Sequence, residues 1–273
     1  IDYDPAPILQ VQPTEAMAET FSKDRLAPMI RDCPTIRSKV SDAKSRDSNN
    51  TIMHKKFPGG HITLVGANTP SQLASRPIRV VLFDEVDRFP MSAGDEGDPV
   101  SLAIKRTTTF WNRKIVMVST PTIKGVSRIE MEYEDSSQET WNLPCPDCGE
   151  YQPLEWEQLK FKNKGEDDVE ILGFACKSCG ALNDEHTWKK QKGKWIAKYP
   201  NRRKKRGFHL NELASPWKRW DEVVRDFLHA KKSPETLKVW VNTSMGRTWE
   251  EYGDLDMDEL LAKRREMYNC EVP

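Results

Sequence analysis

Four short apolar runs lie within the first 118 residues, and each ends in a polar or glycine-containing loop. They occupy Ile8–Val11, Ile62–Val65, Arg79–Phe83 and Ile115–Val118. Because consecutive residues in each run are apolar, both faces of each strand would be buried, which is typical of a parallel sheet covered by helices. The runs therefore predict an α/β fold whose functional loops lie at the carboxyl ends of the strands.

Helix signals separate these runs. Thr14 precedes an amphipathic segment that extends to about Ile30, Thr69-Pro70-Ser71-Gln72 combines a cap with a first-turn proline and a capping-box glutamine, and Asp98-Pro99 begins a segment that ends near Phe110. Strands that alternate with helices predict right-handed crossovers. Later helices are expected at Arg219–Ala230, from Ser233 to about Thr243, and at Asp258–Tyr268.

The composition is that of a water-soluble globular protein. The chain has 273 residues, 37% of them hydrophobic and 31% charged, which is enough for one large α/β domain or two smaller ones. It has no run near the roughly 20 apolar residues that cross a bilayer, and no basic start followed by an apolar segment. We therefore expect a cytoplasmic protein without membrane contact.

Charge is unevenly distributed, although the 42 basic and 42 acidic residues cancel. The segment His186–Arg206 has ten Lys or Arg and no acid, whereas Glu250–Glu259 has six acids and no base. Trp188, Trp195 and Tyr199 interleave with the bases, a pattern that suits contact with a DNA strand. The alternative is that the aromatic rings anchor a basic hairpin whose charges are only solvated.

The run V-V-L-F-D-E-V-D at Val80–Asp87 would carry Asp84 and Glu85 to the carboxyl end of a buried strand. ATP hydrolysis needs one carboxylate to hold Mg²⁺ and a second to orient or deprotonate the attacking water. Asp84 would take the first role and Glu85 the second. Side chains of adjacent residues point in different directions, so the two need not compete for one ion. A surface turn after a buried strand is the alternative.

Other residues could complete such a site. Ser119 and Thr120 follow the next apolar run, where small hydroxyl side chains could sense the terminal phosphate of ATP, although Ser, Thr and Pro are also common in loops. Arg76 could supply positive charge to the transferring phosphate, or could simply face solvent at a helix end. Gln12-Pro13-Thr14 could touch nucleic acid or the internal hinge of a motor domain, or could be a plain helix cap.

Two C-x-x-C pairs, Cys145/Cys148 and Cys176/Cys179, are each followed by glycine. Two residues between thiolates allow both sulfurs to reach one ion, and the glycine accepts the left-handed turn that this requires. Because all four ligands would be thiolates, the pattern predicts a structural Zn²⁺ site within a zinc ribbon. A pair of reduced or redox-active dithiols is the alternative.

No G-x-x-x-x-G-K-[ST] phosphate loop occurs in the 273 residues, and Gly59-Gly60 lacks the Lys-Ser or Lys-Thr that would follow. In this fold class the phosphate loop follows the first strand. We therefore expect a fragment that lacks the first strand and the phosphate loop, and that is inactive toward ATP on its own.

Longer blocks carry a family resemblance. They are G-A-N-T-P-S-Q-L-A-S-R-P at Gly66–Pro77, D-E-V-D-R-F-P at Asp84–Pro90, G-D-P-V at Gly97–Val100, S-T-P-T-I-K-G-V-S-R-I-E at Ser119–Glu130, and the run Ala230–Thr243. Together with the cysteine pairs they cover nearly the whole chain. The sequence resembles the large terminase subunit of tailed bacteriophages, in its lambda-like branch.

The resemblance implies an ATPase motor that drives viral double-stranded DNA into a procapsid, joined to an endonuclease that cuts concatemeric DNA. By match of motif, Asp84 and Glu85 are the Mg²⁺ and water residues, Ser119 and Thr120 belong to the segment that couples ATP to DNA movement, and Arg76 is a further catalytic residue. Implied partners are a small terminase subunit, a portal protein with its procapsid, and further copies of the chain. The implied location is the cytoplasm of the bacterial host.

The resulting expectation is a three-layer parallel-sheet ATPase domain of the P-loop type, RecA-like or helicase-like, incomplete at its N-terminus and with an inserted zinc ribbon. Residues 1–140 would be the motor core, 141–185 the ribbon, 186–250 the remainder of the ATPase region, and 251–273 a linker toward a nuclease domain that this segment lacks. Two alternatives remain open at this point: a helicase-like nucleic-acid translocase, and a zinc-ribbon binding module for DNA or protein on a catalytically inactive scaffold.

Overall fold

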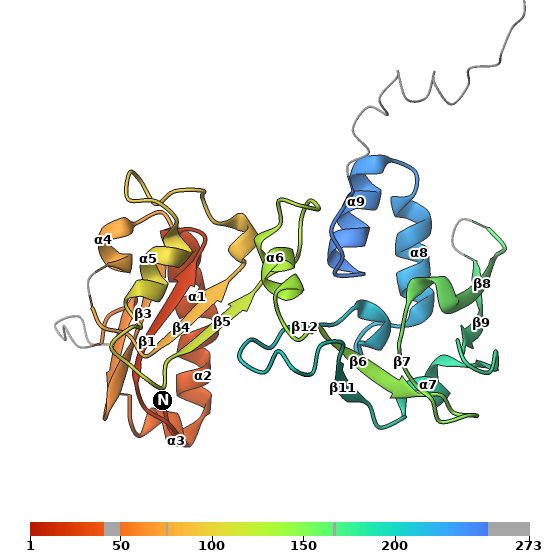
Figure 1. Cartoon of the computed structure of the whole chain (residues 1–273), viewed down its shortest axis with the longest axis horizontal. Coiled ribbons are helices and arrows are strands. Elements are labelled where there is room, and N and C mark those ends of the chain that lie inside the picture. The colour runs from red at the N-terminus through yellow and green to blue at the C-terminus, as the bar shows by residue number, and fades with distance from the viewer. Residues whose placement is uncertain (41–49, 75, 166–167, 251–273) are drawn as a thin grey trace, which may run out of the picture. The chain divides into compact units, whose positions relative to one another are not determined.

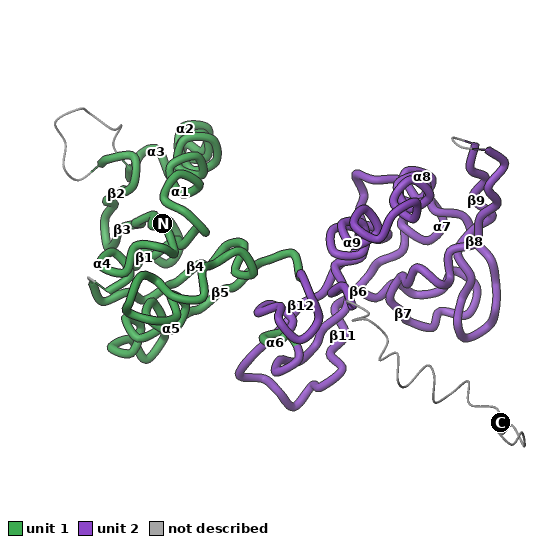
Figure 2. Tube along the Cα trace, turned by 90° about the horizontal axis from the view of Figure 1, so that it is seen from above, with its two compact units in different colours: residues 1–121, 131–133 green, residues 122–130, 134–273 purple. Residues whose placement is uncertain are grey.

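The computed structural model describes residues 1–40, 50–74, 76–165 and 168–250. The expected helix at 258–268, most of the acidic run after residue 250, and Cys270 lie outside the described residues. The chain divides into two compact units (Figure 2): unit 1 comprises residues 1–121 and 131–133, and unit 2 comprises residues 122–130 and 134–273. Within the described residues no helix is both long enough and apolar enough to cross a bilayer.

Unit 1 is built on a five-stranded sheet with the strand order β2-β3-β1-β4-β5. Its strands are β1 (Pro7–Gln12), β2 (His54–Phe57), β3 (Gly60–Gly66), β4 (Val80–Asp84) and β5 (Lys114–Val118). The four strands expected from the apolar runs are mutually parallel, as predicted. The fifth, β2, pairs antiparallel with β3 in a hairpin that the apolar pattern does not indicate.

Helices cover both faces of this sheet, so that unit 1 has three layers (Figures 1 and 2). One face carries an almost continuous helical segment that begins after the N-cap Thr14, whose hydroxyl accepts the Met17 N–H at 3.2 Å. The segment comprises α1 (Glu15–Phe21), a π-helical turn (Ser22–Leu26), α2 (Ala27–Asp32) and α3 (Pro34–Arg37). The other face carries α4 (Pro70–Leu73) and α5 (Pro99–Lys105), and the Asp98 carboxylate caps α5.

Side chains from the sheet fill the space on both sides. Ile62, Leu64 and Phe57 pack with Ala18 and Leu26 of the first helical segment. Val11, Val81 and Phe83 are fully or almost fully buried in the central strands. A rigid central sheet therefore presents the carboxyl ends of β1, β4 and β5 side by side, which is the edge where ligands bind in parallel α/β sheets.

Unit 2 contains two small sheets and a group of helices. One sheet has the order β10-β9-β8, and in the other β6 lies between β11 and β12 and also pairs with β7. The strands are β6 (Glu139–Pro144), β7 (Tyr151–Pro153), β8 (Leu159–Asn163), β9 (Val169–Ala175), β10 (Leu182–Asn183), β11 (Lys194–Ala197) and β12 (Phe208–His209). The helices are α7 (Glu185–Lys189), α8 (Trp220–Ala230) and α9 (Pro234–Thr243), and α6 (Arg128–Glu134) contains residues of both units. Short 3₁₀ turns lie at Val86–Arg88 in unit 1 and at Trp156–Gln158 and Glu212–Ala214 in unit 2.

One core joins the cysteine-containing strands of unit 2 to its helices. Trp188 is fully buried, and its ring centroid lies 5.2 Å from that of Phe174 in β9. The ring centroid of Trp220 in α8 lies 5.7 Å from that of Phe174. Trp240 of α9 packs 4.7 Å from Trp156. The segment that carries the cysteines therefore shares its apolar core with the helices of residues 220–243.

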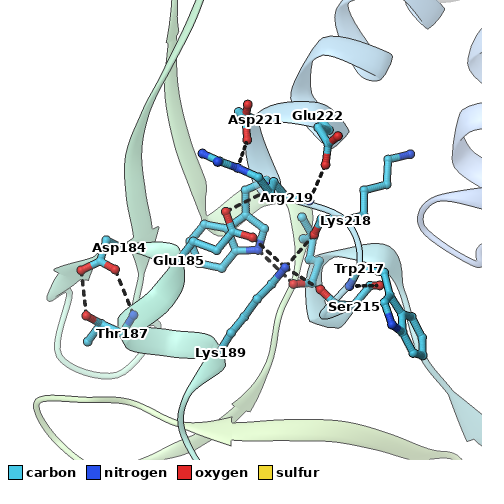
Figure 3. A network of polar contacts seen from close by, with 12 residues as sticks. Asp184, Glu185, Thr187, Lys189, Ser215, Trp217, Lys218, Arg219, Asp221 and Glu222 are labelled. Carbon is cyan, nitrogen blue, oxygen red and sulfur yellow. Dashed lines mark hydrogen bonds and ion pairs between the residues drawn. The ribbon is translucent and has the colours of Figure 1, made fainter.

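A polar network fastens α7 to the loop before α8 (Figure 3). Lys189 reaches into that loop, donates to the carbonyls of Ser215 and Lys218 at 2.6 and 2.8 Å, and pairs with Glu185 at 2.7 Å. Glu185 in turn accepts the Trp220 N–H at 3.0 Å. Lys189, one of the ten bases of the basic run, thus has a structural role.

Candidate active site and cysteine cluster

Asp84 and Glu85 lie at the carboxyl end of β4, with the last residues of β1 and β5 on either side. Asp84 is the final residue of the strand and lies opposite Val118 of β5. The Gln12 side chain, 3% exposed at the end of β1, donates to Asp84 Oδ2 at 3.0 Å. The amide group of Gln12 thus fixes the orientation of the first carboxylate.

Glu85 departs from the strand in a left-handed conformation, with φ 56° and ψ 49°. A non-glycine residue rarely adopts this geometry, and such backbone strain is concentrated at functional sites. Its side chain is 32% exposed, and Arg88 Nε lies 3.3 Å from Oε2 without the alignment of a hydrogen bond. Oε2 is therefore a buried carboxylate oxygen with a positive charge nearby and no hydrogen-bond donor among the described residues.

Ser119 follows β5 and lies beside the turn after Glu85. Its hydroxyl accepts the Asp87 N–H at 3.2 Å and donates to the Thr120 carbonyl at 3.1 Å. This pair of bonds links the loop after β5 to the loop that carries the carboxylates. A displacement of either loop would therefore strain or break these hydrogen bonds to the other loop.

Arg76 lies elsewhere in unit 1. It is exposed and lines a cavity of about 450 Å³ together with His54, Thr63 and Gln72. Burial, and after it the positive charge of Arg76, lower the pKa of His61 in the same region. The cavity is lined by residues of β1, β2, β3 and α4, and the sheet order places β1 between β3 and the carboxylate strand β4.

The four cysteines of the two C-x-x-C pairs meet in unit 2, with all four Sγ atoms within 4.8 Å of one another. The Cys145–Cys179 and Cys148–Cys176 sulfur distances are both 3.8 Å. Two thiolates on a tetrahedral zinc ion with bonds of about 2.3 Å lie about 3.8 Å apart, so the geometry of the cluster fits Zn²⁺.

The backbone turns at both cysteine pairs have the conformation that the C-x-x-C-G spacing predicts. Gly149 and Gly180 both adopt positive φ, 76° and 74°, as the spacing predicts, and each donates its N–H to the carbonyl of the first cysteine of its pair. Burial opposes ionisation of Cys176. The N–H groups of Cys179 and Ser178 and the Gln152 side chain outweigh it, so that the pKa of Cys176 falls to about 6. Burial raises the pKa of Cys145. At Cys179 the Ala181 N–H is outweighed by burial and the neighbouring thiols, which raise the pKa to about 12. Cys176 is therefore the thiol of these three that ionises first.

Sequence reasoning missed two of these contacts. Gln12 was considered as a contact for nucleic acid or a hinge, whereas its partner is Asp84. Gln152, which donates to Cys176 Sγ at 3.0 Å, has no signal in the sequence. Of the two roles considered for Trp188, contact with DNA and anchoring of a basic hairpin, its full burial against Phe174 supports the second.

Comparison with known proteins gives a consistent family. The family model described as phage terminase large subunit gpA, ATPase domain, matches residues 1–195, and the gpA endonuclease domain model matches residues 205–273. The second match includes residues that sequence reasoning assigned to the rest of the ATPase region and to a linker.

Curated relatives carry the same description. The chain is 29% identical to the terminase large subunit of enterobacteria phage P21, with 97% of this chain and 45% of that protein covered. It is 26% identical to the terminase large subunit of Escherichia phage lambda, with 96% and 44% covered. The chain thus spans less than half the length of these relatives.

Among solved structures, the large terminase ATPase domain of Thermus phage P74-26 matches with a TM-score of 0.31 and 16% identity, and the match covers 50% of this chain and 53% of that one. The assignment comes from the family model, which covers well over half of the sequence, and not from this structural likeness. The chain belongs to the gpA family of phage terminase large subunits.

Proposed function

We propose that this chain contains the ATP-hydrolysing edge of a motor that drives viral double-stranded DNA into a procapsid. The observation that carries the proposal is the placement of Asp84 and Glu85 at the carboxyl end of β4, between Gln12 and Ser119. In a gpA-family chain, this pair answers the need of phosphoryl transfer for one metal-binding and one water-orienting carboxylate.

The two carboxylates fit different tasks. Bound Mg-ATP would supply the phosphoryl group and the metal that neutralises its charge. Asp84 would bind the metal through Oδ1, because Gln12 already holds Oδ2. Glu85, whose side chain is 32% exposed, would accept a hydrogen bond from the attacking water through its carboxylate.

Ser119 and Thr120 would couple ATP to DNA movement. Because Ser119 Oγ accepts the Asp87 N–H, the loop after β5 follows any shift of the carboxylate loop. We propose that loss of the terminal phosphate moves these two loops together. Arg76 keeps its assignment as a catalytic residue in this proposal, although it lines the cavity beside β3, two strands away from β4.

The phosphate-binding loop would be contributed by residues other than these 273, because the sequence has no G-x-x-x-x-G-K-[ST]. β5 pairs only with β4 among the described strands, so we propose that a strand from those other residues would pair with its second edge. The 273 residues alone would then bind ATP poorly.

The cysteine cluster would hold one structural Zn²⁺ through Cys145, Cys148, Cys176 and Cys179. The sulfur distances fit a tetrahedral ion, and four thiolates leave no open position for catalysis. The proposed ribbon, residues 141–185, would brace the core that it shares with α8 and α9.

The complete protein would also cleave concatemeric DNA, and would act in the cytoplasm of the bacterial host with a small terminase subunit, a portal protein on the procapsid, and further copies of itself. The match of the endonuclease model to residues 205–273 supports a nuclease in the same polypeptide. We assign no nuclease residue in this segment.

The test is a packaging reaction with the complete terminase, procapsids and ATP, in which DNA inside procapsids is protected from DNase. The Glu85→Gln protein should protect no DNA, whereas Glu96→Gln, an exposed acid in the loop after the site, should package as the unmodified protein does. Packaging by the Glu85→Gln protein at the unmodified rate would refute the proposed function.

A further inference from the structure

One face of the β11-β6-β12 sheet combines exposed aromatic rings with positive charge. The strand register places Trp195 opposite Trp141 and Phe208 opposite Glu139, so these side chains share a face. The other face is turned inward at His209, whose Nε2 bonds to the carbonyls of Met245 and Gly246 at 3.1 and 3.0 Å. We define the aromatic–basic face as Trp195, Lys198, Tyr199, Arg202, Arg203, Lys204, Arg206 and Phe208.

The rings of this face are exposed but are already in contact with other groups. Trp195, Tyr199 and Phe208 are 38%, 37% and 49% exposed. The Trp195 ring packs edge-to-face on Trp141 and on Phe208, with centroids 5.4 and 5.1 Å away. Rings interlocked in this way make poor stacking platforms for bases.

Positive groups lie over these rings. The Arg202 guanidinium is 4.2 Å from the Tyr199 centroid, Lys198 Nζ is 5.3 Å from the same centroid, and Arg206 is 4.8 Å from Phe208. Such cation–π contacts hold long side chains in place. Arg202 is held further, because it donates to the carbonyls of Glu134 and Ser136. The rings therefore act as supports that fix cations at the surface.

Some cations of the basic run are neutralised within unit 2. Glu139 binds Arg206 through two bonds of 2.7 Å, Asp135 pairs with Lys205, and Glu185 pairs with Lys189. The remaining seven pair with no carboxylate of the described residues: Lys190, Lys192, Lys194, Lys198, Arg202, Arg203 and Lys204. Four of these seven belong to the aromatic–basic face, within seven consecutive residues.

We propose that the aromatic–basic face binds the sugar-phosphate backbone of double-stranded DNA without reading its sequence. The four cations of this face that lack a carboxylate partner among the described residues lie within residues 198–204, so they suit a line of phosphates and would release counterions on binding it. We expect the rings to act through the cations that they hold and not as base-stacking sites, because each ring already contacts another ring or a cation. This inference rests on the proposed DNA-packaging function and assigns a surface to its substrate.

The experiment measures DNA binding by the 273-residue chain without ATP, by fluorescence anisotropy of a labelled 30-base-pair duplex over a KCl series. The triple variant Lys198→Gln/Arg203→Gln/Lys204→Gln should bind at least tenfold more weakly at about 0.1 M salt. Its slope of log K against log [KCl] should be shallower by about 2 to 3, since each lost phosphate contact removes about 0.9.

The matched control removes charge from another sheet of the same unit. Lys160 and Lys162 lie on β8 and are exposed. The Lys160→Gln/Lys162→Gln protein should bind duplex DNA as tightly as the unmodified chain. All three proteins should show the same circular dichroism and thermal unfolding, because the changed side chains do not belong to the core.

A second pair of variants tests the role of the rings. Tyr199→Phe keeps a ring under Arg202 and Lys198 and should bind normally. Tyr199→Leu should lower the affinity for duplex DNA and for single-stranded DNA by the same factor. The substitution frees the cations and removes no stacking site. A loss of affinity by Tyr199→Leu for single-stranded DNA alone would show that the face binds by base stacking and not through the backbone. That result would overturn the proposal.

Two further results would overturn the surface assignment: no duplex binding by the unmodified chain, or equal affinity of the triple variant and the unmodified chain. Neither result would affect the proposed motor function, since ATP turnover and packaging by the complete terminase are measured separately.

Discussion

At the scale of single residues, the backbone of Glu85 carries the most information about function. Among the described residues only Glu85 and Gln138 are non-glycine residues with positive φ. The left-handed conformation costs roughly 1–2 kcal/mol for a residue with a Cβ. At Glu85 this conformation ends the strand directly after Asp84, which keeps its hydrogen bond from Gln12, while Glu85 Oε2 has no hydrogen-bond donor among the described residues.

Replacement of Glu85 should therefore separate stability from activity. Glu85→Gly should be more stable than Glu85→Ala by about 0.5–1 kcal/mol, because glycine adopts positive φ without steric cost. Both proteins should lack ATPase activity in the complete terminase. Urea unfolding of the two variants measures the difference, and a glycine variant less stable than the alanine variant would show that the left-handed backbone is not strained.

His209 provides a pH-dependent test in unit 2. Burial, its largest influence, lowers the pKa of His209, although the carbonyls of Met245 and Gly246 act in the opposite direction. A lowered folded-state pKa means that the stabilisation is present above the unfolded value of about 6.5 and is lost as pH falls toward the folded value.

The free energy of unfolding should therefore fall as the pH is lowered below about 6.5, by at most about 1.4 kcal/mol per pH unit for one proton. In His209→Gln this part of the slope should disappear. Tryptophan fluorescence during urea unfolding at several pH values measures it, and parallel pH profiles for the two proteins would contradict the assignment.

At the scale of elements, the four parallel strands of the sheet were predictable from the sequence, whereas the hairpin strand β2 and the cap of α4 were not. Consecutive apolar residues mark β1, β3, β4 and β5, and this pattern is that of strands buried on both faces. Both faces are buried in β1 and β3, whereas β4 alternates buried with half-buried residues and β5 has no fully buried residue, with Val118 57% exposed. β2 carries His54, Lys55 and Lys56 and leaves none, although Lys55 is buried and donates to the Thr51 carbonyl at 2.6 Å. The side chain of Thr69, expected to cap α4, accepts no hydrogen bond from that helix, although the Thr69 carbonyl accepts the N–H groups of Gln72 and Leu73. Local polar patterns depend on tertiary contacts that a sequence does not specify.

Gly66 at the end of β3 tests how closely α1 must approach the sheet. A Cβ at this position would lie 2.5 Å from the Glu15 nitrogen and 2.9 Å from the Thr14 carbonyl carbon, both backbone atoms that cannot move independently. Gly66→Ala should therefore destabilise unit 1 by about 1–3 kcal/mol, as measured by chemical denaturation followed by far-UV circular dichroism.

Gly165→Ala is the control, because a Cβ there meets nothing closer than Asp168 Cβ at 4.0 Å. Equal stability of Gly66→Ala and Gly165→Ala would mean that α1 can retreat from the sheet without cost.

At the scale of the whole molecule, two units with separate cores divide the work. The core of unit 1 supports the carboxylate edge, and the core of unit 2 joins the cysteine segment to α8 and α9. The cysteine spacing predicted the meeting of the four sulfurs, because two C-x-x-C turns have few geometries. It did not predict the shared core, since Trp188, Trp220 and Trp240 meet across long separations in sequence.

Metal removal should act on one unit. Eight of the nine tryptophans belong to unit 2, and the ninth, Trp111, is 95% exposed, so tryptophan fluorescence reports the unfolding of unit 2. A strong zinc chelator, or Cys179→Ser, should shift this transition to lower denaturant and should release about one zinc ion per chain. Cys33→Ser, which removes a half-buried thiol in unit 1, should change neither quantity. An unmodified chain that contains no zinc would contradict the metal site.

Asp84 and Glu85 together would hydrolyse ATP. This role is tested by ATP binding and ATP turnover, both measured on the complete terminase. Glu85→Gln should bind ATP with the unmodified Kd but turn it over at least about 100-fold more slowly, as expected when a water-orienting carboxylate is lost. Asp84→Asn should lose its response to Mg²⁺. Normal turnover by Glu85→Gln, with Kd also unchanged, would contradict the account.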